Sequence, residues 1–182
     1  MSDERPVWAD EKPELVAHDP AWLELGATHQ ARLAELLAPW LVAGVEHIGS
    51  TAVPGLPAKP IVDLMASVRD LEAAVDGAAG RLAEHGWCYV PPALDLWPWR
   101  RFFVLPDAAG QRRLAHLHLI AAGHSRWHEQ LNFRDALRRD LALAQRYADA
   151  KRLLAAEHPD DREAYTEGKA DFLARERITP PR

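Results

Sequence analysis

The residues best suited to chemistry lie in one continuous segment, His47 to Leu64, with the sequence HIGSTAVPGLPAKPIVDL. It combines the run Gly49-Ser50-Thr51 with Lys59 and with Asp63, which stands among apolar residues. Glycine lets the backbone approach a ligand closely, hydroxyl groups donate to phosphate oxygens, and a carboxylate on a nearby strand holds a metal. The segment therefore contains the parts of a nucleotide site.

The aspartate lies within an apolar run, residues 60–68, that is rich in β-branched side chains and predicts a strand. Alternation along a strand places Asp63 on one face with Ile61 and Met65. A carboxylate buried without a partner is costly, so Asp63 needs a metal, a cation or backbone donors. A functional carboxylate is one interpretation, and a structural aspartate in a salt bridge is the other.

Two histidines lie two positions apart in a later apolar run, residues 113–120. In a strand, His116 and His118 face the same side and Leu117 and Leu119 face the other. The pair suits metal binding or phosphate contact, with two half-buried polar residues on a solvated face as the alternative. A histidine-triad hydrolase needs a third histidine where Ile120 stands, so that class is set aside.

The loop between these features, residues 49–59, has too many glycines and prolines for regular structure. Ser50 and Thr51 either hold phosphate or cap a turn. Lys59 either reaches a phosphate as a point charge or is solvated. The loop is not a Walker A motif, because Leu56 stands where that motif has lysine.

Further cations lie in the last third of the chain, which is charged and rich in leucine and alanine. Arg134 occurs in LNFRDALRRD, where a solvated helix surface is the alternative to a binding role. The pair Tyr147 and Lys151 recurs as Tyr165 and Lys169 with the same spacing of four. In a helix each pair shares one face.

The elements that must position these residues can be read from periodicity and turn signals. Helices are predicted over residues 20–38 and 71–83, and three more from residue 125 onward. Strands are predicted over residues 42–48, 60–68, 87–90, 101–105 and 113–120, the last two joined by a short hairpin-like connection. This order predicts an α+β fold in which a mixed or antiparallel sheet is flanked by helices. We expect one domain, with an α/β core over about residues 1–124 and a helical part over about 125–182.

Composition limits the classes of partner. The 182 residues are 48% hydrophobic and 27% charged, as in ordinary soluble proteins, and the net charge of -5 provides no positive field for nucleic acid or an anionic membrane. The one cysteine, Cys88, cannot form an internal disulfide, and neither a signal core nor a run of about 20 apolar residues occurs. We expect a cytoplasmic protein with small-molecule partners.

Taken together, these segments resemble the GrpB family, whose members are similar to the nucleotidyltransferase superfamily typified by polymerase beta. The resemblance spans nearly the whole chain and rests on HDPAWLELG, VEHIGSTAVPGLPAKPIVDL, HLHLI, NFRDALRRD, Tyr147 with Lys151, and YTEGKADFL. It implies a nucleotidyltransferase-like fold. In that superfamily a Gly-Ser turn precedes a strand with two acidic residues one apart, which bind divalent metal and the triphosphate.

In this chain Gly49-Ser50 matches the turn and Asp63 matches the first acidic position, whereas Met65 occupies the second and cannot bind magnesium. The superfamily's third carboxylate corresponds to His116 or His118. One carboxylate with imidazole is a poor magnesium site, because hard cations prefer oxygen. A softer metal, or phosphate oxygens from the substrate, would have to complete it.

The resemblance implies a metal-dependent nucleotidyltransferase acting on a nucleoside triphosphate and a small-molecule acceptor. Its implied phosphate-binding residues are Gly49, Ser50, Thr51, Lys59, Arg134, Lys151 and Lys169. The implied metal ligands are Asp63, His116 and His118, with Asp63 and His118 catalytic, and His47, Tyr147 and Tyr165 complete the candidate site. The alternatives are a nucleotide-binding or regulatory module without transfer activity, and an ATP-dependent enzyme that forms an acyl or amide bond.

Overall fold

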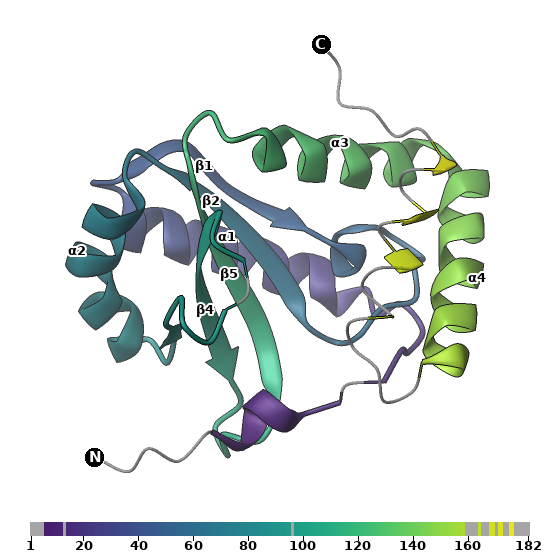
Figure 1. Ribbon diagram of the computed structural model, residues 1–182, viewed down its shortest axis with the longest axis horizontal. Coiled ribbons are helices and arrows are strands. Elements are labelled where there is room, and N and C mark those ends of the chain that lie inside the picture. Colours follow the sequence, from purple (N-terminus) through teal and green to yellow (C-terminus); the bar gives the residue numbers. More distant parts are fainter. Residues whose placement is uncertain are drawn as a thin grey trace.

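The computed structural model describes residues 6–12, 14–95, 97–158, 164, 168–169, 171–172 and 175–176. Within these ranges, helices and strands are mixed along the chain up to β5, and two helices follow (Figure 1). The helices are η1 (Val7–Asp10), α1 (Ala21–Leu37), η2 (Ser50–Ala52), α2 (Leu71–Glu84), α3 (Ser125–Arg139) and α4 (Leu141–Glu157), where η marks a 3-10 helix. The strands are β1 (Leu41–Ile48), β2 (Val62–Val68), β3 (Cys88–Val90), β4 (Arg100–Pro106) and β5 (Arg113–Ala121).

Short side chains at the helix starts explain several of these boundaries. Asp19 accepts a hydrogen bond from the backbone N–H of Ala21 at 2.9 Å at the start of α1. Asp70 and Asp140 are the N-cap residues of α2 and α4, and each accepts from the backbone N–H three positions on. These carboxylates satisfy N–H groups that have no partner within the helix and favour its positive end. At the other end of α2, Gly86 adopts a φ of 83°, which stops the helix before β3.

The five strands form a mixed sheet in the order β1-β2-β5-β4-β3. Strands β2 and β5 run parallel at its centre, and the other neighbours are antiparallel. The register of the parallel pair places Asp63 beside His116 and Met65 beside His118. The predicted mixed α+β fold is therefore confirmed, and the two segments singled out by sequence lie on adjacent central strands.

One face of the sheet carries the main core. Side chains from β2 and β5, including Leu64 and Leu117, pack there against α1 and α2, as the alternation of these strands predicts. The opposite face carries Asp63, His116 and His118. It is covered in part by α3, where Trp127 packs against Met65 and neighbouring residues of the sheet. Polar groups that need a partner thus lie on the side of the sheet with less apolar cover.

Helices α3 and α4 also pack on the loop before β2. Val53 and Leu56 of this loop contact Leu137, Leu143 and Tyr147. An isolated bridge between Val16 and Ala58 fixes the other side of the loop. The loop that was predicted to lack regular structure therefore holds only the short helix η2, and packing from two directions positions it.

The predicted elements agree closely with the observed ones. Strand β2 begins at Val62 rather than Pro60, because proline has no N–H to donate to a ladder and the N–H of Ile61 bonds to the carbonyl oxygen of Lys59 instead. Of the three helices predicted after residue 125, α3 and α4 are confirmed, and the third falls mostly outside the described residues, as does Tyr165. No helix in the part of the chain that the structure describes has both the length and the apolar character needed to cross a bilayer.

Candidate metal and nucleotide site

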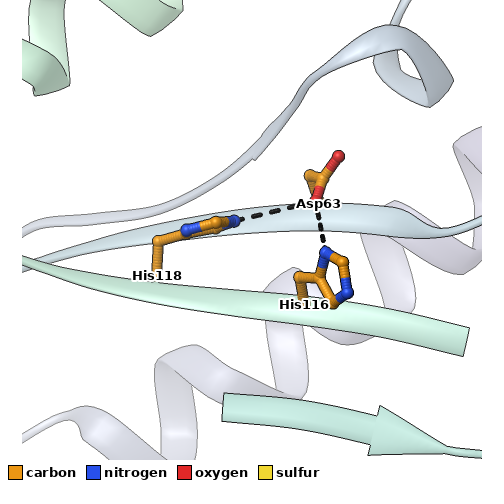
Figure 2. A group of neighbouring side chains, drawn as sticks. All are labelled: Asp63, His116 and His118. Carbon is orange, nitrogen blue, oxygen red and sulfur yellow. Dashed lines mark hydrogen bonds and ion pairs between the residues drawn. The ribbon is translucent and has the colours of Figure 1, made fainter. Parts of the chain in front are cut away.

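The structure brings together the three residues that the sequence suggested as metal ligands. Asp63 Oδ1 lies 3.0 Å from His116 Nδ1 and 3.6 Å from His118 Nε2. Figure 2 shows both rings turned toward the carboxylate, which projects from β2 while the rings project from β5. One ligand atom from each residue lies within 4.8 Å of the others. This spacing allows all three to contact a single ion.

The electrostatics of this group favour an ionised carboxylate and a neutral imidazole. Burial alone would raise the pKa of Asp63, but its interactions with His116 and His118 outweigh burial and lower that pKa well below the usual range. Burial lowers the pKa of His118 to about 4, more than the attraction of Asp63 raises it. At neutral pH the group is therefore a carboxylate beside at least one uncharged ring.

This donor set fits a divalent cation of intermediate softness. One carboxylate and two imidazoles are typical ligands of zinc and similar transition metals, whereas magnesium prefers oxygen. Met65 contributes nothing here, because its side chain is fully buried against Trp127 and Ile120. Magnesium at Asp63 would need most of its oxygens from a bound substrate.

The Gly-Ser turn lies directly against this carboxylate. Gly49 has φ 72° and ψ -170°, a conformation that is essentially restricted to glycine. A β-carbon at this position would lie 2.7 Å from Asp63 Oδ2. Glycine is therefore required both by the backbone and by the closeness of the acid. The turn that would approach a phosphate and the acid that would hold a metal are in contact.

Thr51 and His47 are buried beneath this turn. The Thr51 hydroxyl lies 3.0 Å from His47 Nε2 and 3.3 Å from the carbonyl oxygen of Ile61. Burial lowers the pKa of His47 to about 4, so the ring is neutral at neutral pH. A β-carbon on Gly26 of α1 would overlap the His47 ring. These two residues join α1, β1 and the loop, and their polar atoms bond to each other.

Lys151 of α4 lies under the same loop with only 2% of its surface exposed. Its ammonium group donates to Ser50 Oγ at 3.0 Å and to the carbonyl oxygen of Pro57. It also lies 4.9 Å from the centre of the Tyr147 ring, so the predicted helix-face pair is confirmed. Burial, with repulsion from Lys169 and Arg152, lowers the pKa of Lys151 to about 7. Lys151 thus connects α4 to the hydroxyl of the Gly-Ser turn.

We expect this lysine to make stability depend on pH. The unfolded chain takes up the lysine proton below its ordinary pKa of 10.5, whereas the folded chain does so only near pH 7. Between these values the unfolded state binds more protons, so the free energy of unfolding rises with pH, by at most about 1.4 kcal/mol per pH unit from this group. Urea denaturation between pH 7 and 9 should therefore show wild type gaining stability relative to Lys151→Met. If the free energies of unfolding of the two proteins changed equally with pH, the expected dependence on Lys151 would be contradicted.

Arg134 of α3 connects that helix to β1. Its guanidinium lies 2.7 Å from Glu46 Oε2 and 3.0 Å from the carbonyl oxygen of His47, and it also pairs with Asp135. Lys59 is half-buried three positions before β2, and Lys169 is half-buried in the C-terminal part. Arg134 is thus close to the loop, but its donors already contact protein oxygens.

Sequence reasoning missed two residues near the site, Arg100 and its partner Asp95. Arg100, at the start of β4, places Nη1 2.6 Å from His118 Nδ1. Its other nitrogens bond Asp95 at 2.8 Å each, and the guanidinium lies 4.1 Å above the Phe102 ring. Arg100 belongs to no motif, but it lies two positions before Phe102, which pairs with His118 across the β4-β5 hairpin. Alternation along β4, which places Arg100 on the same face as Phe102, was thus the signal that could have found it.

The sequence profile of the family described as GrpB protein matches residues 12–177. The chain belongs to the GrpB family. The UPF0157 protein YqkA of Bacillus subtilis is 32% identical over 92% of this chain, which spans only 47% of that relative.

Solved structures support the family and the fold. The crystal structure of the conserved protein GrpB from Enterococcus faecalis is 28% identical, with a TM-score of 0.72 over 90% of this chain and 99% of that one. A cytoplasmic RNA terminal U-transferase is only 11% identical and has a TM-score of 0.53 over 84% of this chain and 48% of its own. This GrpB chain therefore has a nucleotidyltransferase-like fold.

Proposed function

We propose that this GrpB protein is a metal-dependent nucleotidyltransferase that acts on a nucleoside triphosphate and a small-molecule acceptor. The observation that carries the proposal is the contact between the Gly49 turn and Asp63. In a nucleotidyltransferase-like fold, a close backbone turn beside an ionised carboxylate is suited to a phosphate chain and its metal. The close approach of His116 and His118 to the same carboxylate supports the proposal further, because these rings favour the ionised form of Asp63 that can hold a metal.

Asp63 would hold the metal, and the two imidazoles are within reach both of such an ion and of Asp63 itself. When bound, the metal would neutralise charge on the phosphate oxygens. The turn, with Ser50 held by Lys151, would orient the triphosphate. An acceptor oxygen or nitrogen would attack the α-phosphorus in line. The bond to the bridging oxygen would break, pyrophosphate would leave, and the acceptor's proton would pass to a nearby base.

One observation favours a second candidate, a nucleotide-binding module of the same fold without transfer activity. At the second acidic position of the superfamily, Met65 is 0% exposed and belongs to an apolar cluster with Ile48, Ile120 and Trp127. No carboxylate can take its place without entering that cluster. A protein of this kind would bind a nucleotide and respond to it.

Pyrophosphate release separates the two candidates. The protein would be incubated with the four common ribonucleoside triphosphates, a pool of small metabolites, and Mn²⁺, Zn²⁺ or Mg²⁺. The transferase predicts release of pyrophosphate that requires both metal and a component of the pool. Calorimetry with the same triphosphates tests the binding module, because it detects nucleotide binding without transfer. Nucleotide binding that needs no metal, with no pyrophosphate from any mixture, would support the binding module and argue against the enzyme.

A further inference from the structure

The contact between Arg100 and His118 determines where the imidazole carries its hydrogen. A guanidinium has only N–H donors and remains charged at any physiological pH. At 2.6 Å from Arg100 Nη1, His118 Nδ1 must therefore act as the acceptor. A neutral imidazole has one N–H and one lone pair, so the N–H of His118 lies on Nε2. This nitrogen points toward Asp63 Oδ1, 3.6 Å away.

This arrangement is the reverse of the one found around metal-binding histidines. Such a histidine coordinates the metal through one nitrogen and donates the N–H of the other to a carboxylate, carbonyl or water. Here the outer partner of His118 is a donor. With its lone pair directed at Arg100, the ring has none left on the side of Asp63. His118 can coordinate a metal there only if Arg100 moves away.

Arg100 is held firmly in place. Asp95 binds it through two parallel hydrogen bonds of 2.8 Å, and the two side chains are only 10% and 7% exposed. The guanidinium also lies above the Phe102 ring and 5.5 Å from the centre of the Trp99 ring. A buried bidentate pair that also contacts aromatic rings is costly to break, because separation would leave both charges without a partner.

His116 also directs an N–H at Asp63, but for a different reason. Its Nδ1 lies 3.0 Å from Asp63 Oδ1, while its Nε2 is buried and has no hydrogen-bond partner among the described residues. Placing the N–H on Nε2 would leave a buried donor unsatisfied, which is unfavourable. The N–H therefore belongs on Nδ1, where Asp63 accepts it. Both imidazoles thus present N–H groups to one carboxylate oxygen.

We propose that Arg100 is a positioning residue that keeps the N–H of His118 directed at Asp63 and withholds the lone pair of this ring from the metal. The inference rests on the metal site of the proposed function. It leaves Asp63 Oδ2, beside the Gly49 turn, as the main protein ligand. The remaining ligands would then be oxygens of the nucleotide and of water, so a metal is expected to bind more tightly when the phosphate chain is present. Such an oxygen-rich set suits a hard cation better than the three protein residues would.

Nitrogen-15 NMR of the metal-free protein tests this directly. A His118→Gln variant identifies the His118 signals in the histidine spectrum. In wild type at neutral pH, His118 should carry its hydrogen on Nε2, and addition of Zn²⁺ alone should leave its ring nitrogens unchanged. In Arg100→Gln, the amide oxygen can accept from Nδ1, so the hydrogen should move to Nδ1. The matched control is Arg101→Gln, because Arg101 pairs with Glu72 instead.

Zn²⁺ titration supplies the second readout. Arg100→Gln should bind Zn²⁺ about 10- to 100-fold more tightly than wild type, as expected when a histidine ligand gains a proper outer acceptor. The Arg100→Gln change leaves Asp95 without its partner. If this single variant does not fold, the double variant Arg100→Gln/Asp95→Asn is titrated in its place. A wild-type His118 with its hydrogen on Nδ1, or one that binds Zn²⁺ while Arg100 is present, would overturn the inference. Neither readout requires nucleotide, so a lack of transfer activity alongside the expected tautomer would count against the proposed function alone.

Discussion

Asp63→Asn is expected to reduce metal-dependent pyrophosphate release by about 10³-fold, which corresponds to the several kcal/mol that a bound metal contributes to phosphoryl transfer. Asparagine has nearly the same shape as aspartate but lacks the negative charge that holds a cation. Its carbonyl oxygen can still accept from His116, so the fold should persist. The measurement is the initial rate of pyrophosphate release at saturating triphosphate.

A matched control separates loss of the site from a general loss of charge. Asp76 is exposed on α2, the helix that packs on the opposite face of the sheet, and Asp76→Asn removes the same charge there. This control should retain the wild-type rate. Circular dichroism melts should show both variants folded. A folded Asp63→Asn protein with a rate within a few-fold of wild type would exclude Asp63 as the metal-holding group.

Gly49→Ala is expected to damage the site and the fold together. Alanine must adopt φ 72° and ψ -170°, which costs about 1–3 kcal/mol of folding free energy. Its β-carbon would also lie 2.7 Å from Asp63 Oδ2, so either the carboxylate or the turn must shift. We expect the midpoint of urea denaturation to fall, and metal-dependent triphosphate binding, measured by calorimetry, to weaken by at least about tenfold.

Gly55→Ala provides the comparison. Gly55 lies in the same loop and also has a positive φ, 76°, but a β-carbon there would meet no atom within 4 Å. This variant should lose some stability through its backbone and keep its affinity for triphosphate. If Gly49→Ala and Gly55→Ala bind triphosphate equally well, the closeness of Gly49 to Asp63 has no role in the site.

The strand faces of the candidate site could be predicted from sequence, because alternation along a strand is a local property. It placed Asp63 and Met65 on a shared face of their strand, and His116 and His118 on a shared face of theirs, as observed. The pairing of β2 with β5 is not local, and no periodicity in either strand specifies it. The nearness of Asp63 to the two histidines was therefore implied only by the family resemblance, and their contact is seen in the folded chain.

The roles of the cations were harder to predict for a related reason. Helical spacing put Tyr147 and Lys151 on one face, but spacing does not say how deep that face lies. Lys151 is buried and bonds the loop, because α4 packs directly on Val53 and Leu56. The contact of Arg100 with His118 was not predicted, because the two residues are 18 positions apart and a charged residue at a strand end usually faces solvent.

The central parallel pair determines when the site can exist during folding. Asp63 and His116 are 53 residues apart, and α2, β3 and β4 all lie between them in the chain. Contacts between residues this far apart cost loop-closure entropy, which slows their formation. A chain that has reached only β4 carries the loop and its acid but neither imidazole. Asp63 should therefore gain its histidine partners only when β5 pairs with β2, and it would lack both imidazoles in any form of the chain without that pairing.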